Sequence, residues 1–154
     1  MKMKETPLDS NAPPDSGNVD VAGAGGPQGV AVNLGNGSYF TFDTGGFDCR
    51  KMSMERFART LERFVDRPVV DMTGLASNYD FKLALTPEDG RAMHIRSAIT
   101  AGVVLPPDVR RMADGAGYES LFSAMEWLGL KLERRKAPLD VWVVDRIEKA
   151  PTAN

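Results

Sequence analysis

Apolar and polar residues alternate over several short stretches of the chain, and this period of two predicts β-strands that bury one face. The first stretch runs from Val30 to Leu34 and the second from Tyr39 to Phe42. Gly35-Asn36-Gly37 lies between them, and Asn-Gly supplies the positive φ angles of a tight turn, so a β-hairpin is expected. Further strands are expected at Phe47 to Met52, Val69 to Thr73, Tyr79 to Leu85, Leu130 to Arg135 and Leu139 to Lys149.

Two other stretches repeat apolar residues at the three- and four-residue spacing of an amphipathic α-helix. The first follows Ser53, whose hydroxyl can cap a helix, and it ends before Pro68. The second runs from Glu119 to Leu128, with Gly129 as its C-terminal stop. The apolar stripe of the first helix comprises Met54, Phe57, Ala58, Leu61, Phe64 and Val65.

The predicted order is therefore a hairpin followed by β-α-β-β-α-β-β. Two helices on one face of a small mixed sheet make an α+β two-layer sandwich. Between residues 86 and 116 the periodicity weakens, and prolines and glycines interrupt it. We expect an insertion or long loop there, with one short helical turn near Val109 to Ala113.

Composition changes the picture at the N-terminus. Nine of the 15 glycines lie within the first 46 residues, and residues 1–29 also hold four prolines. Such a segment buries too little apolar surface to offset the roughly 1–2 kcal/mol per residue that ordering its backbone costs. We therefore expect a flexible leader at 1–29, a single domain at 30–149 and a tail at 150–154.

Charge and cysteine content exclude several classes of protein. Lys and Arg total 19 against 21 Asp and Glu, a net charge of -2, which fits neither a strongly basic nucleic-acid binder nor an acidic disordered tail. The single cysteine, Cys49, cannot form an internal disulfide or a Cys-rich zinc site, and it is expected to be a half-buried strand residue. No apolar run marks a signal peptide or a transmembrane segment. No metal or cofactor is expected.

His94 is the only histidine and therefore the one candidate acid–base group of its type, but no nucleophile motif lies beside it. A catalytic interpretation would use His94 with Asp71 or Glu88. The carboxylates of Asp66, Asp71 and Asp80 match no regular metal-ligand spacing and are expected to support turns and local pairs. We expect no catalytic residue set.

The last predicted strand offers a candidate interaction surface. Trp142 and Val144 share the sheet face opposite Val141 and Val143. If helices cover only one face, an exposed Trp–Val patch is a candidate for partner binding, whereas the alternative is burial under the hairpin or the long loop. Basic residues near the turn before this strand form a surface on which an anionic partner could dock. The alternative is a solvated surface of mixed charge. The candidate partner-binding residues are Trp142, Val144, Arg134 and Arg135.

Three blocks of the sequence resemble one protein family. They include Asp66-Arg67-Pro68-Val69-Val70-Asp71, Leu128-Gly129-Leu130-Lys131-Leu132-Glu133 and Asp140-Val141-Trp142-Val143-Val144-Asp145. Together they resemble the C-terminal part of an uncharacterised, soil-associated family expanded in Acidobacteria, a domain of unknown function. The predicted element order also resembles the short N-terminal domain of secretins and TonB-dependent transducers, which implies a docking role in the bacterial cell envelope.

These observations lead to one expectation and one alternative. We expect a non-catalytic protein-interaction module of the bacterial cell envelope, periplasmic by that resemblance, which binds another protein rather than nucleic acid. The alternative is a small hydrolase or ligand-binding domain with a site in the 86–116 loop around His94.

Overall fold

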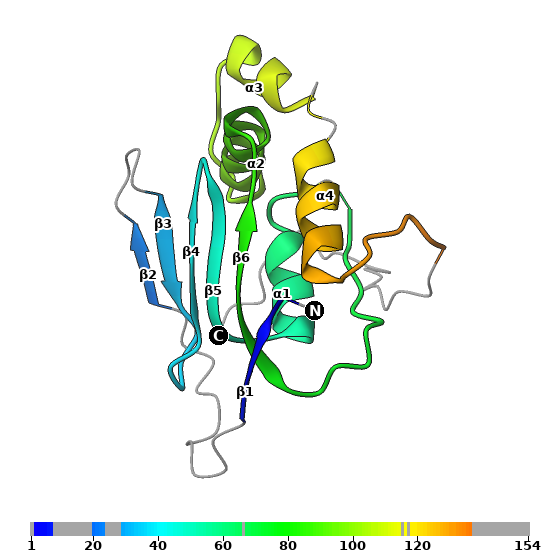
Figure 1. The fold of residues 1–154 in the computed structure, drawn as a ribbon. Coiled ribbons are helices and arrows are strands. Elements are labelled where there is room, and N and C mark those ends of the chain that lie inside the picture. The colour runs from blue at the N-terminus through cyan, green and yellow to red at the C-terminus, as the bar shows by residue number, and fades with distance from the viewer. Residues whose placement is uncertain are drawn as a thin grey trace, which may run out of the picture.

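The computed structural model describes residues 2–7, 20–23, 29–65, 67–114, 116 and 118–136. Six strands form one sheet in the order β1-β6-β5-β4-β3-β2, and each neighbouring pair is antiparallel (Figure 1). The strands are β1 (Lys4–Thr6), β2 (Asp20–Gly23), β3 (Val30–Asn33), β4 (Tyr39–Asp43), β5 (Gly46–Ser53) and β6 (Asn78–Ala84). The helices are α1 (Met54–Leu61), α2 (Pro87–Thr100), α3 (Pro107–Asp114) and α4 (Glu119–Leu128).

The α+β two-layer class is confirmed, and several elements lie where the periodicity places them. The expected hairpin is formed by β3 and β4, and its turn residues Asn36 and Gly37 have φ angles of 53° and 73°. The strands expected at 47–52 and 79–85 are β5 and β6. The two expected helices are α1 and α4, and the Ser53 hydroxyl caps α1 by accepting from the Arg56 N–H at 3.3 Å. The sheet is antiparallel within the described residues rather than mixed.

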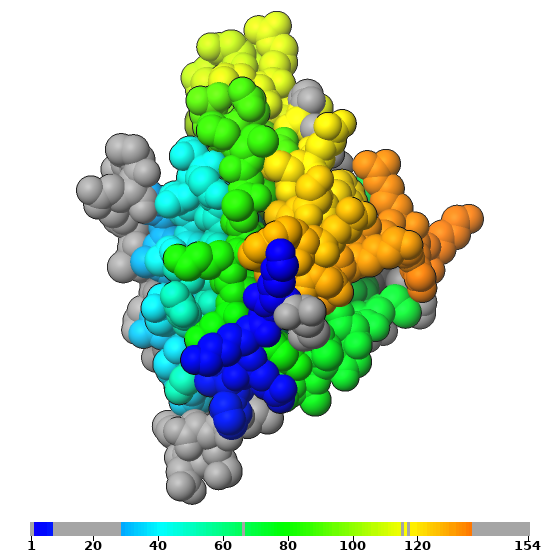
Figure 2. Space-filling model, in the orientation of Figure 1, coloured from blue at the N-terminus to red at the C-terminus, as the bar shows by residue number. Residues whose placement is uncertain are grey.

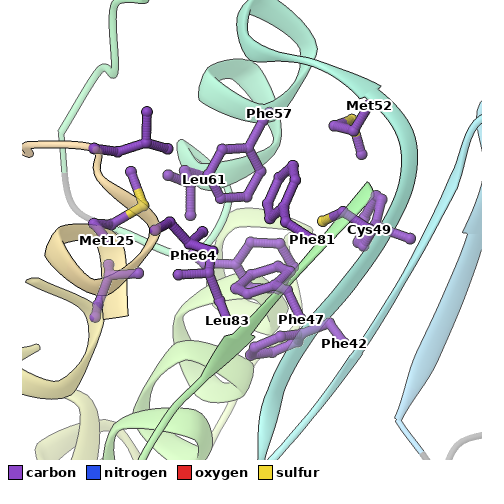
Figure 3. Close-up of a cluster of buried hydrophobic side chains, with 14 of the residues drawn as sticks. Phe42, Phe47, Cys49, Met52, Phe57, Leu61, Phe64, Phe81, Leu83 and Met125 are labelled. Atoms are coloured by element: carbon purple, nitrogen blue, oxygen red, sulfur yellow. The ribbon is translucent and has the colours of Figure 1, made fainter. Parts of the chain in front are cut away.

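One face of the sheet is apolar and carries the core. Phe42 pairs with Phe47 across β4 and β5, and Cys49 pairs with Phe81 across β5 and β6. Helix α1 places Phe57 against this face, with its ring centroid 4.9 Å from that of Phe81 (Figure 3). Full burial of each such side chain contributes about 1.5–3 kcal/mol, so these residues hold the helices onto the sheet.

The opposite face of the sheet is polar. Asp48 on β5 lies directly across from Lys82 on β6, and its Oδ2 is 2.6 Å from the Lys82 Nζ. The Arg50 Nε lies 3.2 Å from the Asp48 Oδ1, and its Nη1 lies 3.6 Å from the Asp80 Oδ2. Charge pairs of this kind are made at a wet surface, whereas the apolar face packs against α1 and α4.

The Asp80 carboxylate closes an irregularity in β5. The β5–β6 register shifts between Cys49 and Met52, and Lys51 there has a φ of 45°. The Lys51 N–H leaves the ladder and donates to the Asp80 Oδ1 at 2.9 Å. This carboxylate therefore satisfies the backbone of a β-bulge, as expected for a structural rather than a metal-binding aspartate.

The loop expected at 86–116 is wrong, because two helices occupy most of it. Helix α2 begins with a capping Thr86 and with Pro87 in its first turn, and α3 packs against α2. Sequence periodicity missed α2 because its buried positions, Asp89, Gly90, Ala92 and Met93, hold only one large apolar side chain and form no apolar stripe. A Cβ on Gly90 would lie 2.2 Å from the Thr44 carbonyl oxygen, so glycine permits this close approach.

The flexible leader expected at 1–29 is also wrong for the described parts of that segment. Strand β1 pairs with β6, with Lys4 opposite Asp80, and β2 pairs with β3. Met3 is buried in the core, and the Thr6 hydroxyl lies 3.3 Å from the Asp80 Oδ1. Strands of three or four residues carry too little pattern to be recognised, since their stability comes from the edge that they pair with. The division into leader, domain and tail otherwise stays a prediction.

Two expected strands are wrong, and one lies outside the described residues. Residues 69–73 and 130–135 belong to no strand or helix in the described chain, although Leu130 and Leu132 turn inward while Lys131 and Glu133 face solvent. The alternation of apolar and polar residues in these segments correctly predicts which side chains are buried. Neither segment, however, has a partner strand among the described residues. The strand expected at 139–149 lies outside the described residues, together with Trp142 and Val144.

Candidate partner-binding groove

A groove of about 880 Å³ opens between α1 and α4. Its two walls are the segments 67–75 and 129–136, which we call the loop wall and the tail wall. In Figure 2 the tail wall (orange) protrudes from the body of the molecule above the loop wall (green). The floor is apolar and comprises Met54, Phe57, Ala58, Leu61 and Val65 from the α1 side and Leu121, Phe122 and Met125 from α4. Val65 and Phe122 are half-buried, and the other floor side chains are buried.

Both walls carry backbone groups without backbone partners. Within the described residues, no backbone–backbone hydrogen bond involves Val69 to Thr73 or Lys131 to Lys136. Side chains satisfy three of the loop-wall N–H groups: Val69 donates to the Glu62 Oε1 at 3.0 Å, Thr73 to the Asp71 Oδ1 at 2.8 Å and Leu75 to the Thr73 hydroxyl at 3.2 Å. The remaining N–H and C=O groups beside the groove can pair with an added chain.

The loop wall exposes large apolar side chains. Val70 is 50% exposed and Met72 is 71% exposed, and both line the groove. The Asp71 carboxylate also accepts from the Thr73 hydroxyl at 2.8 Å, and this local turn holds the wall in shape. The sequence analysis did not identify Val70, Met72 and Phe122 as surface residues. The pair Val69-Val70 was the available signal, because it lies outside any helical stripe.

The tail wall carries a basic rim. Four basic residues of the tail wall and Arg67 of the loop wall line the groove against two acidic residues, Asp71 and Glu133. Glu133 pairs with Lys131 and lies 2.5 Å from the Arg135 Nη2. Hydrogen bonds from these two cations lower the pKa of the Glu133 carboxyl below its ordinary value. The basic excess of the rim favours an acidic ligand.

The candidate partner-binding residues fall into two groups. Arg134 and Arg135 lie on the tail wall and are exposed at the groove. Trp142 and Val144 lie outside the described residues. Part of the predicted surface is thus brought to the groove.

His94 does not join the residues of the alternative catalytic site. It lies on α2, half-buried, with its ring centroid 4.4 Å from that of Phe42, and it does not line the groove that Asp71 lines. Glu88 lies earlier on α2, and the helical spacing between the two residues directs their side chains about 120° apart around the helix axis. Burial lowers the pKa of the His94 imidazole, and the charge of Asp43 opposes that shift. His94 thus packs against Phe42 on the core side of α2.

Other kinds of site find no support in the part of the chain that is described. Burial raises the pKa of the Cys49 thiol, so that it stays protonated and unreactive. No group of three or more His, Cys, Asp or Glu side chains among the described residues is arranged to hold a metal ion. None of the described helices is long and apolar enough to span a bilayer.

Comparison with protein families identifies relatives for nearly the whole chain. Residues 1–147 match the family described as "Protein of unknown function (DUF3738)". The chain belongs to this family. The match includes residues 1–29, which agrees with the pairing of β1 and β2 into the sheet. No curated protein and no solved structure matches the chain. The resemblances to an Acidobacteria family and to secretin and TonB domains stay predictions.

Proposed function

We propose that this member of the DUF3738 family is a non-catalytic protein-interaction module whose groove receives an extended, apolar segment of another protein. The observation that carries the proposal is the groove itself, an apolar floor between two walls in which Val69 to Thr73 and Lys131 to Lys136 make no backbone–backbone hydrogen bond with other described residues. The cell-envelope location rests on an element order that the described residues do not reproduce, because 69–73 and 130–135 are not strands.

The floor supplies the attraction and the walls supply the geometry. Transfer of apolar area from water contributes about 25 cal/mol per Å², so a ligand side chain of valine or leucine size gains about 1.5–3 kcal/mol on burial. A strand laid between the walls would add backbone hydrogen bonds worth about 0.5–1.5 kcal/mol each. This combination is how proteins bind peptides by strand addition.

The rim indicates the charge of the ligand. Arg134 and Lys136 have no carboxylate partner among the described residues, whereas Lys131 and Arg135 share Glu133. An acidic residue beside the apolar run of a ligand would pair with these free cations. Such rim pairs contribute mainly to the rate of association and to orientation.

The chemistry of the groove supports binding rather than catalysis. Neither His94 nor Cys49 lines it, Asp71 is engaged by Thr73, and Glu133 is engaged by Lys131 and Arg135. A general base has to lie within hydrogen-bond reach of a substrate proton with a pKa near the working pH. The Glu133 carboxyl, with its pKa lowered, is unsuited to that role.

The test uses a fluorescein-labelled peptide of about ten residues that alternates Val with Thr and carries Asp at both ends, which we call the strand probe. Binding to the full chain is measured by fluorescence anisotropy. The double variant Val70→Glu, Met72→Glu is expected to bind at least about ten-fold more weakly, since it places charges on the apolar loop wall.

The matched control is Val103→Glu, Val104→Glu, which changes two exposed valines between α2 and α3, away from the groove. It is expected to bind the strand probe as the wild type does. Both double variants alter exposed positions, and their free energies of unfolding in urea should stay within about 1 kcal/mol of the wild type. Equal binding by the groove variant and the control variant would overturn the proposal.

A further inference from the structure

We infer that the same groove is also a site for a free fatty acid, whose acyl chain lies on the apolar floor and whose carboxylate meets the basic rim. The binding of the fatty acid rests on the groove alone. Its consequence rests on the proposed function, because a fatty acid in the groove excludes the partner strand and so regulates its binding. The residues that carry the inference all lie between Met54 and Lys136.

The first argument is the size of the groove and the chemistry of its lining. Its volume of about 880 Å³ lies within the range of roughly 300–1,000 Å³ that is usual for small-molecule sites. Three methionines, Met54, Met72 and Met125, line it, and their unbranched side chains adapt to the shape of a flexible ligand. Each methylene group that moves from water onto such a lining raises the affinity by up to about four-fold.

The second argument is the hydrogen bonding of the lining. The floor consists of hydrocarbon and thioether side chains. Of the hydroxyls in the lining, that of Tyr118 already accepts from the Arg96 Nε at 2.9 Å, and that of Thr73 donates to the Asp71 Oδ1 at 2.8 Å. Because an acyl chain has no polar atom, it covers this floor without leaving a donor or acceptor unpaired, whereas a peptide also needs partners from the walls.

The third argument is the uneven charge of the two walls. Five basic side chains line the groove against two acidic ones, and four of the five basic side chains lie on the tail wall. Arg134 and Lys136 there have no carboxylate partner among the described residues. The loop wall instead carries Asp71 and the exposed side chains of Val70 and Met72. A ligand with one anionic end and an apolar body matches this division, with its carboxylate beside the tail wall.

The first experiment measures the binding of decanoate to the full chain by isothermal titration calorimetry, below the concentration at which decanoate forms micelles. We expect one decanoate per chain, and an affinity for hexanoate at least about ten-fold lower, because hexanoate buries fewer methylene groups. The groove variant Val70→Glu, Met72→Glu should bind decanoate at least about ten-fold more weakly than the wild type. The control variant Val103→Glu, Val104→Glu should bind it as the wild type does.

The second experiment tests the rim with the double variant Arg134→Gln, Lys136→Gln. It should bind decanoate about three- to ten-fold more weakly than the wild type, since exposed charge pairs contribute modestly. It should bind decanol, the uncharged alcohol of the same chain length, with unchanged affinity. The matched control is Arg110→Gln, Arg111→Gln, which removes two exposed arginines of α3 that do not line the groove and should leave decanoate binding unchanged.

Three results would overturn the inference. The first is equal decanoate affinity in the groove variant and the control variant. The second is the binding of several decanoate molecules per chain with no loss in either variant, which is the behaviour of a detergent. The third is co-sedimentation with phosphatidylglycerol vesicles in the absence of decanoate binding, which would assign the surface to a membrane.

The third experiment measures the competition that regulation requires. Decanoate at about ten times its Kd should weaken the binding of the strand probe about ten-fold, because one ligand excludes the other by mass action. Hexanoate at the same concentration should have a much smaller effect. Simultaneous binding of decanoate and the strand probe would overturn the inference.

The two proposals fail in different ways. If decanoate binds the wild type and not the groove variant, but the strand probe binds neither, the proposed function is overturned and the fatty-acid site stands. If the strand probe binds and decanoate does not, the inference is overturned and the proposed function stands. All the variants change exposed side chains, so urea unfolding of each one separates a loss of binding from a loss of folding.

Discussion

Helix α4 is held on its two sides in different ways. On the side of α2, the Ser120 N–H and hydroxyl donate to the Asp89 Oδ2 at 2.9 and 2.5 Å. On the side of α1, α4 lines the groove with Leu121, Phe122 and Met125. Charge-assisted hydrogen bonds fix distance and direction, whereas apolar contacts are non-directional. One side of the helix is therefore locked, and the other can adapt to an occupant.

The locked side is built from residues that serve two elements at once. Asp89 lies in the first turn of α2 and caps α4, whose preceding residue Tyr118 offers no side-chain cap. Arg96 donates to the Tyr118 hydroxyl at 2.9 Å and to the Ala113 carbonyl at 3.1 Å, which joins α2 to the end of α3. If this contrast is correct, substitutions on the α2 side should affect folding, and those on the groove side should affect binding.

The largest effect is expected from Gly90→Ala. The new Cβ would lie 2.2 Å from the Thr44 carbonyl oxygen, so α2 would have to move off the end of β4. We expect a loss of at least about 3 kcal/mol in the free energy of unfolding, measured in urea. Gly102→Ala is the control, because nothing lies within 4 Å of its Cβ and only the left-handed backbone costs about 1 kcal/mol. Equal losses would contradict the close packing of α2.

Asp89→Ala should have the next largest effect. It removes the acceptor for the Ser120 N–H and hydroxyl, and we expect a loss of about 2 kcal/mol in urea unfolding. Asp108→Ala, at the exposed first turn of α3, should cost less than about 1 kcal/mol. Strand-probe binding by the Asp89 variant should be close to that of the wild type. A loss confined to probe binding would reverse the assignment of the two sides.

The smallest effect concerns pH. Burial lowers the pKa of His94, so the folded state binds this proton less readily than the unfolded state does. The free energy of unfolding should be highest above the ordinary histidine pKa near 6.5 and should fall as the pH decreases toward the lowered value. Urea unfolding at several pH values in wild type and His94→Gln measures this. The difference between the two curves should follow that direction, and parallel curves would contradict it.

The sequence was informative where a large apolar residue recurs on one face. The stripe Met54, Phe57, Leu61 predicted α1, and Asn36-Gly37 between two alternating runs predicted the hairpin. Helix α2 could not be predicted in this way because Met93 is the one large apolar side chain among its buried residues, beside Gly90 and Ala92. Arg134 and Arg135 are exposed, and their role in partner binding stays a prediction. The groove beside them joins residues from α1, α4 and two irregular segments. Because the residues of such a surface come from separate segments, they show no periodic pattern along the sequence from which the groove could be predicted.

The pairing of β1 with β6 has a consequence for the order in which the chain folds. The Thr6 hydroxyl meets the Asp80 carboxylate across 74 residues of sequence. Contacts so distant along the chain close large loops and form late, and during synthesis β6 is made long after β1. Until β1 arrives, the outer edge of β6 is an open strand. Strand β1 thus shields the Asn78–Asp80 part of an edge on which nascent chains could otherwise pair with one another.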